Sequence, residues 1–528
     1  IGSLAAGALA IPLNLLVTHA NAASATVVAI VGAGVQLYSI WYLADDKRYG
    51  AFAATVSMFT AAMLLVVMSG DLVLTLIGWE VMGWGSYLLI GHLTAKESAR
   101  RAAVKAFLVT RFADIGFVLG VVMLAVAAGT TQLSKVLVTT GAAVTTALVL
   151  LLMGVAGKSG LVPFHDWLPD AMEGPTPASA LIHGATMVAA GTVVVSSLFP
   201  LYAEHPPARA VLAVLTSVTM VWAALLAFGQ SDLKRMLAYS TLSQVAIMLS
   251  ALSVAPLEVG PGAGLGHLYG HAFFKALLFL GAGWLAAVVG AGTAFAGLRG
   301  RLAPRSALGL SMAVGLASLA GVPPLVGFFS KETVVGTAEE SALNGGGLAA
   351  WLVLVALLVT IPLTAAYATR AWLVLAGARR PAGVAEPVAA AQPVTAGHDE
   401  HGPVGRVASY TVIALALFTV LGGLLLVLAR TGVHLAPVTT VLALVLVAVA
   451  GVLVYRRYAA SGEDPALALG ARTLERADAG YGMDSVYVRV ATWTQAAGRL
   501  VVALDRDVVD AYPRAASRAT VLLGRGLD

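Results

Sequence analysis

The chain has 528 residues, of which 59% are hydrophobic and only 11% are charged, and it contains no cysteine. Soluble domains carry about 25% charged residues, so this composition predicts a protein with many membrane spans. The lack of cysteine excludes a disulfide framework, a thiolate iron–sulfur site, a cysteine zinc site and a cysteine nucleophile. The net charge of only +5, without a basic run interleaved with aromatic residues, argues against a nucleic-acid partner.

About thirteen apolar stretches are long enough to cross a hydrocarbon core of about 30 Å as helices. They are continuous rather than alternating, which predicts helices and not a β-barrel. The stretches lie at 24–42, 53–69, 72–91, 107–128, 142–172, 178–199, 208–228, 237–254, 266–290, 306–336, 348–368, 409–430 and 436–455. The predicted fold class is an all-α integral membrane protein.

Basic residues fall mainly in every second loop between these stretches. If residues 44–50 are cytoplasmic, the loops on that side carry seventeen basic residues, and the opposite loops carry only Lys135, Arg209 and Arg430. This asymmetry is what the positive-inside rule expects for this number of spans. It also places the C-terminal 70 residues on the cytoplasmic side.

Two spans contain glycine and proline breaks together with one lysine each. The fifth reads GVAGKSGLVPFHD at 154–166 and includes Lys158, and the tenth reads GVPPLVGFFSKE at 321–332 and includes Lys331. Discontinuous helices at matching positions of two halves are typical of inverted-repeat transporters, whose ion path lies at the breaks.

A polar loop is predicted at 378–407. Residues His398 to His401 read HDEH and could bind a metal, but a solvated loop is the favoured interpretation, and no metal site is assigned.

From residue 482 the apolar positions have the spacing of one face of an amphipathic helix. The face consists of Val486, Val490, Trp493, Ala497, Leu500, Leu504 and Val508. No apolar run there is long enough to span a membrane. The segment is predicted either to lie on the surface or to connect neighbouring subunits, with its continuity doubtful at Pro513.

Ten ionisable residues lie at predicted membrane depth, where a charge costs about 2.5–3.5 kcal/mol on insertion scales and is usually retained for a function. They are Glu80, Arg111, Asp114, Lys158, His183, His267, His271, Lys275, Lys331 and Glu332. His267, His271 and Lys275 recur every four residues and therefore share one helix face, on which they could exchange protons through water. Tryptophan, phenylalanine and methionine are interpreted as packing residues.

Charge spacing in the first half suggests a switch. Arg111 and Asp114 are three residues apart and can pair. Poor hydration favours the neutral form of Lys158 and a nearby carboxylate favours its charged form, so a changing distance to Glu80 would make Lys158 hold or release a proton. The alternative is a structural role, with Arg111 as an anchor and Lys331 extending to the interface.

Five strings carry a family resemblance. They are GWEVMGWGSYLLIG at 78–91, GKS at 157–159, WLPDAMEGPTPASALIH at 167–183, DLKRMLAYSTLSQ at 232–244 and HAFFKALLF at 271–279. Together they closely resemble the antiporter-like subunits of respiratory complex I, in particular the distal L subunits of bacterial NADH:quinone oxidoreductases. The resemblance runs from about residue 20 to the C-terminus.

The resemblance implies roles for the buried ionisable residues. Glu80 matches the essential carboxylate, Lys158 the central lysine of the first half-channel, and Arg111 with Asp114 the pair that competes for Glu80. The central hydrophilic axis is matched by His183, His267, His271 and Lys275. Lys331, followed by Glu332, matches the exit-side lysine of the second broken helix.

The resemblance also implies two inverted five-helix repeats and a long lateral helix. The expected regions are a first segment at 1–50, repeats at 51–200 and 201–377, a polar loop at 378–407, two helices at 408–457, and a linker with the lateral helix at 458–528. Two helices expected before residue 20 and a final span expected after Asp528 are absent, so the chain is expected to be incomplete at both ends.

The predicted function is proton translocation in the membrane arm of an NADH:quinone oxidoreductase, located in the bacterial cytoplasmic membrane. No cofactor is expected in this chain, while flavin, iron–sulfur clusters and quinone are expected in partner subunits. The alternative is a subunit of a cation/proton antiporter or of an inorganic-carbon uptake pump. Related antiporters commonly have a lysine after Met-Val in the span of His183, whereas residues 187–191 read MVAAG, which favours complex I.

Overall fold

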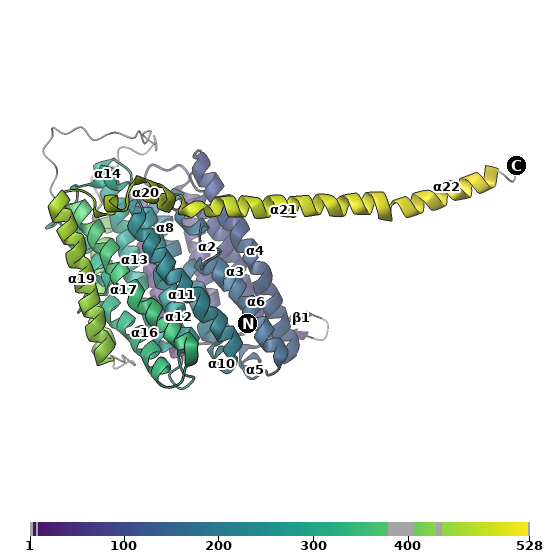
Figure 1. Cartoon of the computed structure of the whole chain (residues 1–528), viewed down its shortest axis with the longest axis horizontal. Helices are drawn as coiled ribbons and strands as arrows, with labels where there is room; N and C mark the ends of the chain where they lie inside the picture. Colours follow the sequence, from purple (N-terminus) through teal and green to yellow (C-terminus); the bar gives the residue numbers. More distant parts are fainter. Residues whose placement is uncertain (1–3, 7–8, 378–404, 429–435, 526–528) are drawn as a thin grey trace. The chain divides into compact units, whose positions relative to one another are not determined.

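The structure is a computed structural model that describes residues 4–6, 9–377, 405–428 and 436–525. It begins with a short antiparallel pair of strands, β1 (Leu4–Ala6) and β2 (Leu9–Ile11). All other regular elements in the described residues are helices (Figure 1). The predicted all-α membrane fold is confirmed.

The helices of the first half follow in chain order. They are α1 (His19–Tyr42), α2 (Tyr49–Val67), α3 (Leu72–Ile90), α4 (Glu97–Ala128), α5 (Leu133–Val136), α6 (Ala142–Ser159), α7 (Trp167–Asp170), η1 (Ala171–Glu173), α8 (Thr176–Gly184), α9 (Met187–Ser197) and α10 (Phe199–Glu204).

The second half and the C-terminal region contain the remaining helices. They are α11 (Pro206–Gly229), α12 (Leu233–Val254), α13 (Gly262–Val289), α14 (Phe295–Leu298), α15 (Ala307–Ala320), α16 (Val326–Leu343), α17 (Gly347–Ala376), α18 (Arg406–Leu428), α19 (Pro437–Ser461), η2 (Pro465–Leu469), α20 (Ala471–Asp478), η3 (Gly480–Gly482), α21 (Met483–Leu504), η4 (Asp505–Val509) and α22 (Ala511–Arg525).

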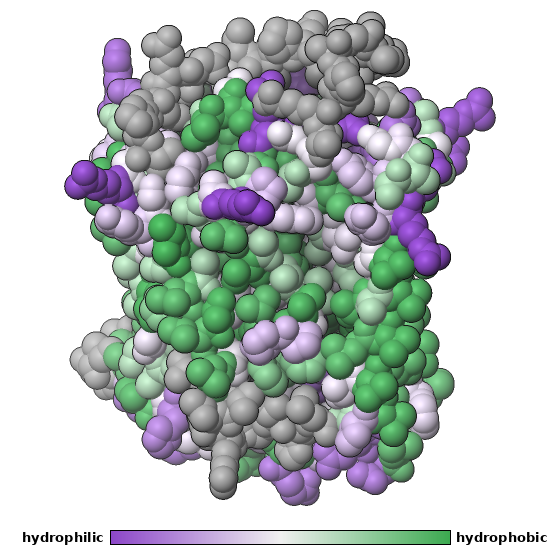
Figure 2. Space-filling model, turned by 90° about the vertical axis from the view of Figure 1, so that its left-hand side faces the viewer, coloured by the Kyte–Doolittle hydropathy of each residue, from purple (hydrophilic) through white to green (hydrophobic). Residues whose placement is uncertain are grey.

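Within the described residues, twelve helical segments are long and apolar enough to span a membrane, with α8 and α9 counted together. The remaining predicted span, at 306–336, corresponds to α15 and α16. Separately, α15 is too short to qualify and α16 is too polar. Figure 2 shows one face of the molecule with hydrophobic side chains across its middle and hydrophilic residues nearer its two ends. This distribution matches a protein embedded in a bilayer.

Both predicted breaks are present, and glycine stops the helix in each. Gly160 ends α6 with φ +65°, and Gly321 ends α15 with φ +84°, a conformation that other residues adopt at a cost. The Leu161 amide then donates back to the Ala156 carbonyl at 2.8 Å and closes the turn. The two breaks leave helix ends inside the protein, where polar groups can meet.

The interior is formed by the helices between the two breaks. The span of α8 and α9 and the span of α12 are buried along their apolar windows, whereas α19 is largely exposed along its length. Leu242 of α12 lies so close to Gly160 that a β-carbon there would approach its Cδ2 within 2.3 Å. The first break is therefore packed directly on α12.

The residues after Leu474 form a second compact unit. In it, α21 is amphipathic in sequence, and none of its residues is buried. This is the pattern of a helix whose apolar face binds a partner or a membrane surface. The interruption predicted at Pro513 lies earlier, in the π-helical turn η4. Pro513 itself is in the first turn of α22, where the N–H that proline lacks would have no intrahelical partner.

Candidate functional site

Four charged residues meet between α3, α4 and α6. The Lys158 ammonium of α6 donates to Oδ2 of Asp114 at 2.9 Å, and both side chains are almost fully buried. The Arg111 guanidinium pairs with the Glu80 carboxylate, and its Nη2 also donates to the Glu80 carbonyl at 3.1 Å. The suggested pairing of Arg111 with Asp114 is therefore wrong, because helix rotation directs the two side chains to different neighbours.

Two uncharged residues of α3 shape this cluster. Trp79 is fully buried, and its indole Nε1 donates to Oδ1 of Asp114 at 2.7 Å. Its ring also lies 5.0 Å from the Lys158 ammonium. A β-carbon built on Gly83 would lie 3.0 Å from Nζ of Lys158 and 3.3 Å from Nη2 of Arg111, so both cations approach the helix at this glycine.

Gly83→Ala is expected to lower the free energy of unfolding by about 1–3 kcal/mol, because the added methyl group overpacks a site occupied by two charged side chains. The matched control is Gly50→Ala in α2, where an added β-carbon meets nothing within 4 Å. Thermal denaturation of the purified protein measures both. Equal melting temperatures for the two variants would contradict the close approach of the cations.

The row of residues on α13 is buried as predicted. His267, His271 and Lys275 have no exposed surface. The Lys275 ammonium donates to the Leu237 carbonyl of α12 at 3.1 Å and to the Ser240 hydroxyl. These contacts connect α13 with the buried helix α12.

His267 of this row contacts a second helix, and His183 adds one further histidine to the interior. His267 Nδ1 lies 2.9 Å from the Ser330 hydroxyl of α16. The His183 ring of α8 packs on Phe279 with 4.8 Å between centroids, and its two nitrogens have no hydrogen-bond partner among the described residues. A buried imidazole without partners is costly, so this position favours a bound water molecule.

Lys331 does not extend to the interface. It is only 3% exposed, and its ammonium donates to the Leu319 carbonyl near the end of α15. A pocket with about 230 Å³ of empty space, including open solvent, is lined by Lys331, Glu332, Gly321 and residues of α19. The second break thus leaves a small pocket, lined largely by apolar residues, beside two ionisable groups.

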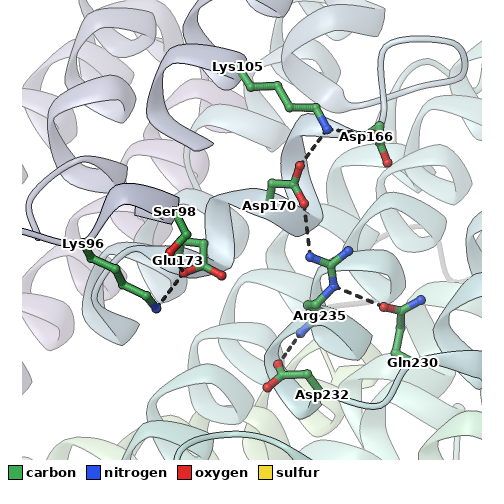
Figure 3. A network of polar contacts seen from close by, with 9 residues as sticks. All are labelled: Lys96, Ser98, Lys105, Asp166, Asp170, Glu173, Gln230, Asp232 and Arg235. Atoms are coloured by element: carbon green, nitrogen blue, oxygen red, sulfur yellow. Dashed lines mark hydrogen bonds and ion pairs between the residues drawn. The ribbon is translucent and has the colours of Figure 1, made fainter. Parts of the chain in front are cut away.

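A second polar network surrounds the segment after the first break (Figure 3). Lys105 of α4 donates to Asp166 at 2.7 Å and to Asp170 at 2.6 Å. Asp170 also accepts from Arg235 of α12 at 3.1 Å, and Arg235 contacts Gln230. These alternating charges connect α4 to α12 through the broken span.

The end of the same segment is held by two lysines. Lys234, in the first turn of α12, is 5% exposed and donates to the carbonyls of Met172 and Gly174 at 2.7 and 2.9 Å. Lys96 pairs with Glu173 at 2.6 Å. Burial alone would raise the pKa of the Glu173 carboxyl, but hydrogen bonds from Lys96 and Ser98 lower that pKa below its usual value, so Glu173 is ionised at neutral pH.

Sequence reasoning missed three of these contributors. Trp79 directly precedes Glu80, and Ser240 lies within the string at 232–244, but neither residue type distinguishes a functional position from packing. At Gly83 the sequence indicates only a position within a predicted helix, and nothing marks this glycine as part of a site. The possible metal site at 398–401 lies outside the described residues.

Two family models match the chain. Residues 69–360 match "NADH:quinone oxidoreductase/Mrp antiporter, TM", and residues 4–53 match "NADH-Ubiquinone oxidoreductase (complex I), chain 5 N-terminus". The first match covers more than half of the chain and includes every residue of the charged cluster and of the interior row.

Curated relatives and a solved structure agree with these matches. NADH-quinone oxidoreductase subunit L of Mycobacterium tuberculosis is 36% identical over 477 residues, which are 86% of this chain and 72% of that protein. NAD(P)H-quinone oxidoreductase subunit 5 of Paulinella chromatophora is 39% identical over 354 residues, which are 64% of this chain and only 53% of that protein. The structure of the Mrp complex from Dietzia sp. DQ12-45-1b matches 97% of this chain and 57% of its own chain, with 25% identity and a TM-score of 0.77.

The fold and the buried charged cluster define a multi-pass membrane protein of the antiporter-like class. The chain belongs to the NADH:quinone oxidoreductase/Mrp antiporter transmembrane family, as an antiporter-like subunit of the L type, also named subunit 5. The resemblance drawn from the sequence is therefore confirmed. The chain spans about half to three quarters of the length of these two relatives.

Proposed function

We propose that this chain translocates protons in the membrane arm of an NADH:quinone oxidoreductase. The observation that supports this most directly is the presence of two adjacent ion pairs beside a helix break. Asp114 with Lys158 is buried, and Glu80 with Arg111 is partly exposed next to it. Quinone reduction in partner subunits that carry flavin and iron–sulfur clusters would supply the energy. It would reach this chain as an electrostatic and conformational change.

The first half-channel would work by exchange of these ion pairs. A carboxylate close to Lys158 favours its protonated form, and withdrawal of that carboxylate favours release of the proton in a poorly hydrated site. With Glu80 on Arg111, only Asp114 holds Lys158. Movement of Glu80 between Arg111 and Lys158 would then control when Lys158 takes up or loses a proton.

The released proton would continue along the buried interior row. It would pass from Lys158 by way of His183, His267 and His271 to Lys275, with the hydroxyls of Ser240 and Ser330 beside this route. Lys331 and Glu332 would form the exit at the pocket of the second break. Water molecules would bridge the remaining gaps.

We also propose where the chain lies in the cell and how its regions are organised. The chain would lie in the bacterial cytoplasmic membrane, with proton entry from the cytoplasm and with 458–528 on the cytoplasmic side. The regions at 51–200 and 201–377 would be the two half-channels, each an inverted five-helix repeat. The helix at 482–528 would contact neighbouring antiporter-like subunits.

Lys158→Met and Glu80→Gln test the proposal in the assembled complex. Loss of a group that transfers protons is expected to lower the proton-pumping rate by about 100-fold or more, with normal assembly. Proton uptake by membrane vesicles during NADH oxidation measures this rate. Lys135→Met, at an exposed position outside the spans, is the matched control. Normal pumping by Lys158→Met would reject the proposal and would favour a passive scaffold.

A second candidate function is cation/proton antiport, supported by the match to the Mrp complex structure. An inorganic-carbon uptake pump is the related alternative. Purification of the native assembly distinguishes the three. Flavin and iron–sulfur subunits in the preparation would support the NADH:quinone oxidoreductase, other membrane subunits alone would support the antiporter, and one soluble zinc protein would support carbon uptake.

A further inference from the structure

We propose that Trp79 is a positioning residue, which makes Asp114 rather than Glu80 the partner of Lys158 while Glu80 is bound to Arg111. This inference rests on the proposed function, because it assigns a role within the same charged cluster. It concerns an uncharged side chain that takes no proton itself.

Two donors contact the Asp114 carboxylate. Its Oδ1 accepts from the Trp79 indole at 2.7 Å, and its Oδ2 accepts from the Lys158 ammonium at 2.9 Å. The two donors therefore hold both oxygens in one orientation. Asp114 is 3% exposed, so water cannot readily replace either donor.

The indole N–H of Trp79 donates and cannot accept. Its hydrogen bond to Oδ1 is stronger when Asp114 is an ionised carboxylate than when Oδ2 carries a proton and Oδ1 is the carbonyl oxygen of a carboxylic acid. Transfer of a proton from Nζ of Lys158 to Asp114 would leave a neutral amine and a carboxylic acid. Trp79 opposes this transfer and so keeps the proton on Lys158.

The indole of Trp79 is fixed in place from both sides. Its ring stacks on Phe117 of α4, with 4.2 Å between centroids and an angle of 2° between planes. Its other neighbour is the Lys158 ammonium, 5.0 Å from the ring, which is a favourable cation–π distance. Trp79 thus contacts α4 and α6 at once.

Trp79 lies directly before Glu80 in α3. Consecutive helical residues project about 100° apart, so the two side chains reach different partners from the same turn. A movement of α3 that releases Glu80 from Arg111 must also move the indole relative to Asp114. The two ion pairs are therefore coupled through the backbone of one helix.

Trp79→Phe in the assembled complex tests this role, because phenylalanine retains an apolar ring and removes only the N–H donor. Two states are in equilibrium: the Lys158 ammonium with the Asp114 carboxylate, and the neutral Lys158 amine with the Asp114 carboxylic acid. Loss of a hydrogen bond to a charged group is expected to shift this equilibrium toward the neutral pair by about 10- to 100-fold. We expect fewer protons pumped per NADH. We also expect a new protonated-carboxyl band in the infrared spectrum, which disappears in the double variant Trp79→Phe/Asp114→Asn.

Trp84→Phe is the matched control, because Trp84 lies on the same helix and is 50% exposed. It should pump as the unmodified complex does. If Trp79→Phe pumps normally without a new carboxyl band, the inference is overturned. If Lys158→Met also pumps normally, the proposed function is rejected as well. If Lys158→Met loses pumping, the proposed function stands and only the role of Trp79 is rejected.

Trp79→His provides a second variant if Trp79→Phe does not assemble. Histidine restores a ring N–H donor, so assembly and part of the pumping should return, and Trp79→Leu should restore neither. Equal failure of Trp79→His and Trp79→Leu would overturn the role of the N–H group.

Discussion

Asp114→Asn is expected to lower the free energy of unfolding by about 3–5 kcal/mol, because it leaves the Lys158 ammonium buried without a carboxylate. Lys158 has no exposed surface, and the nearby Glu80 is already paired with Arg111. The asparagine side chain keeps only one acceptor oxygen, so it can accept from Trp79 or from Lys158 but turns an N–H toward the other donor, and it supplies no negative charge. Denaturation of the purified complex measures the loss.

The double variant Asp114→Asn/Lys158→Met separates charge from shape. Removing both members of a buried ion pair is often neutral, so we expect it to lie within about 1–2 kcal/mol of the unmodified protein. Proton pumping should stay absent in the double variant even though stability returns. If the two single losses simply add, the direct Asp114–Lys158 contact is not the cause.

Arg370→Met is expected to lower the free energy of unfolding by about 3–5 kcal/mol, since it leaves Asp464 without its buried partner. The Arg370 guanidinium donates to both carboxylate oxygens of Asp464 at 2.7 Å and to the Phe228 carbonyl at 2.6 Å. It also lies 4.8 Å from the Phe295 ring. One side chain therefore connects α17, α11 and the segment after α19.

Arg370→Lys is expected to recover only part of this loss, leaving a deficit of about 1–3 kcal/mol. A lysine ammonium cannot form the paired hydrogen bonds of a guanidinium fork and also reach the carbonyl. The control is Arg456→Lys, because Arg456 is exposed on α19. Melting temperatures of the purified protein compare the three variants. Equal temperatures for Arg370→Lys and Arg456→Lys would show that the fork geometry is unimportant.

The membrane spans and both breaks could be predicted because they follow from local properties. A stretch of about 20 apolar residues can satisfy its backbone in lipid only as a helix, and glycine and proline end such a helix. The sequences at 154–166 and 321–332 contain both signals. The burial of the row on α13 followed in the same way, from spacing along one helix.

The partners of the charged residues could not be predicted, because they depend on how neighbouring helices are rotated. Arg111 and Asp114 are one turn apart on α4, yet they contact Glu80 on α3 and Lys158 on α6. Lys331 was misjudged for a related reason, since the Leu319 carbonyl that receives its hydrogen bond is exposed only by the break in α15.

The two helix ends inside the bilayer have a consequence for hydration. Lys158 lies in the last turn of α6, and Lys331 donates to a carbonyl near the end of α15, where the helix dipole places partial negative charge. Lys331 therefore neutralises a helix terminus directly, while Lys158 carries its charge in the last turn of α6 with its ammonium on Asp114. When such a lysine loses its proton, the dipole end loses its cation, and a solvent molecule entering the cavity is the natural replacement. Deprotonation and wetting of the interior would then occur as one event.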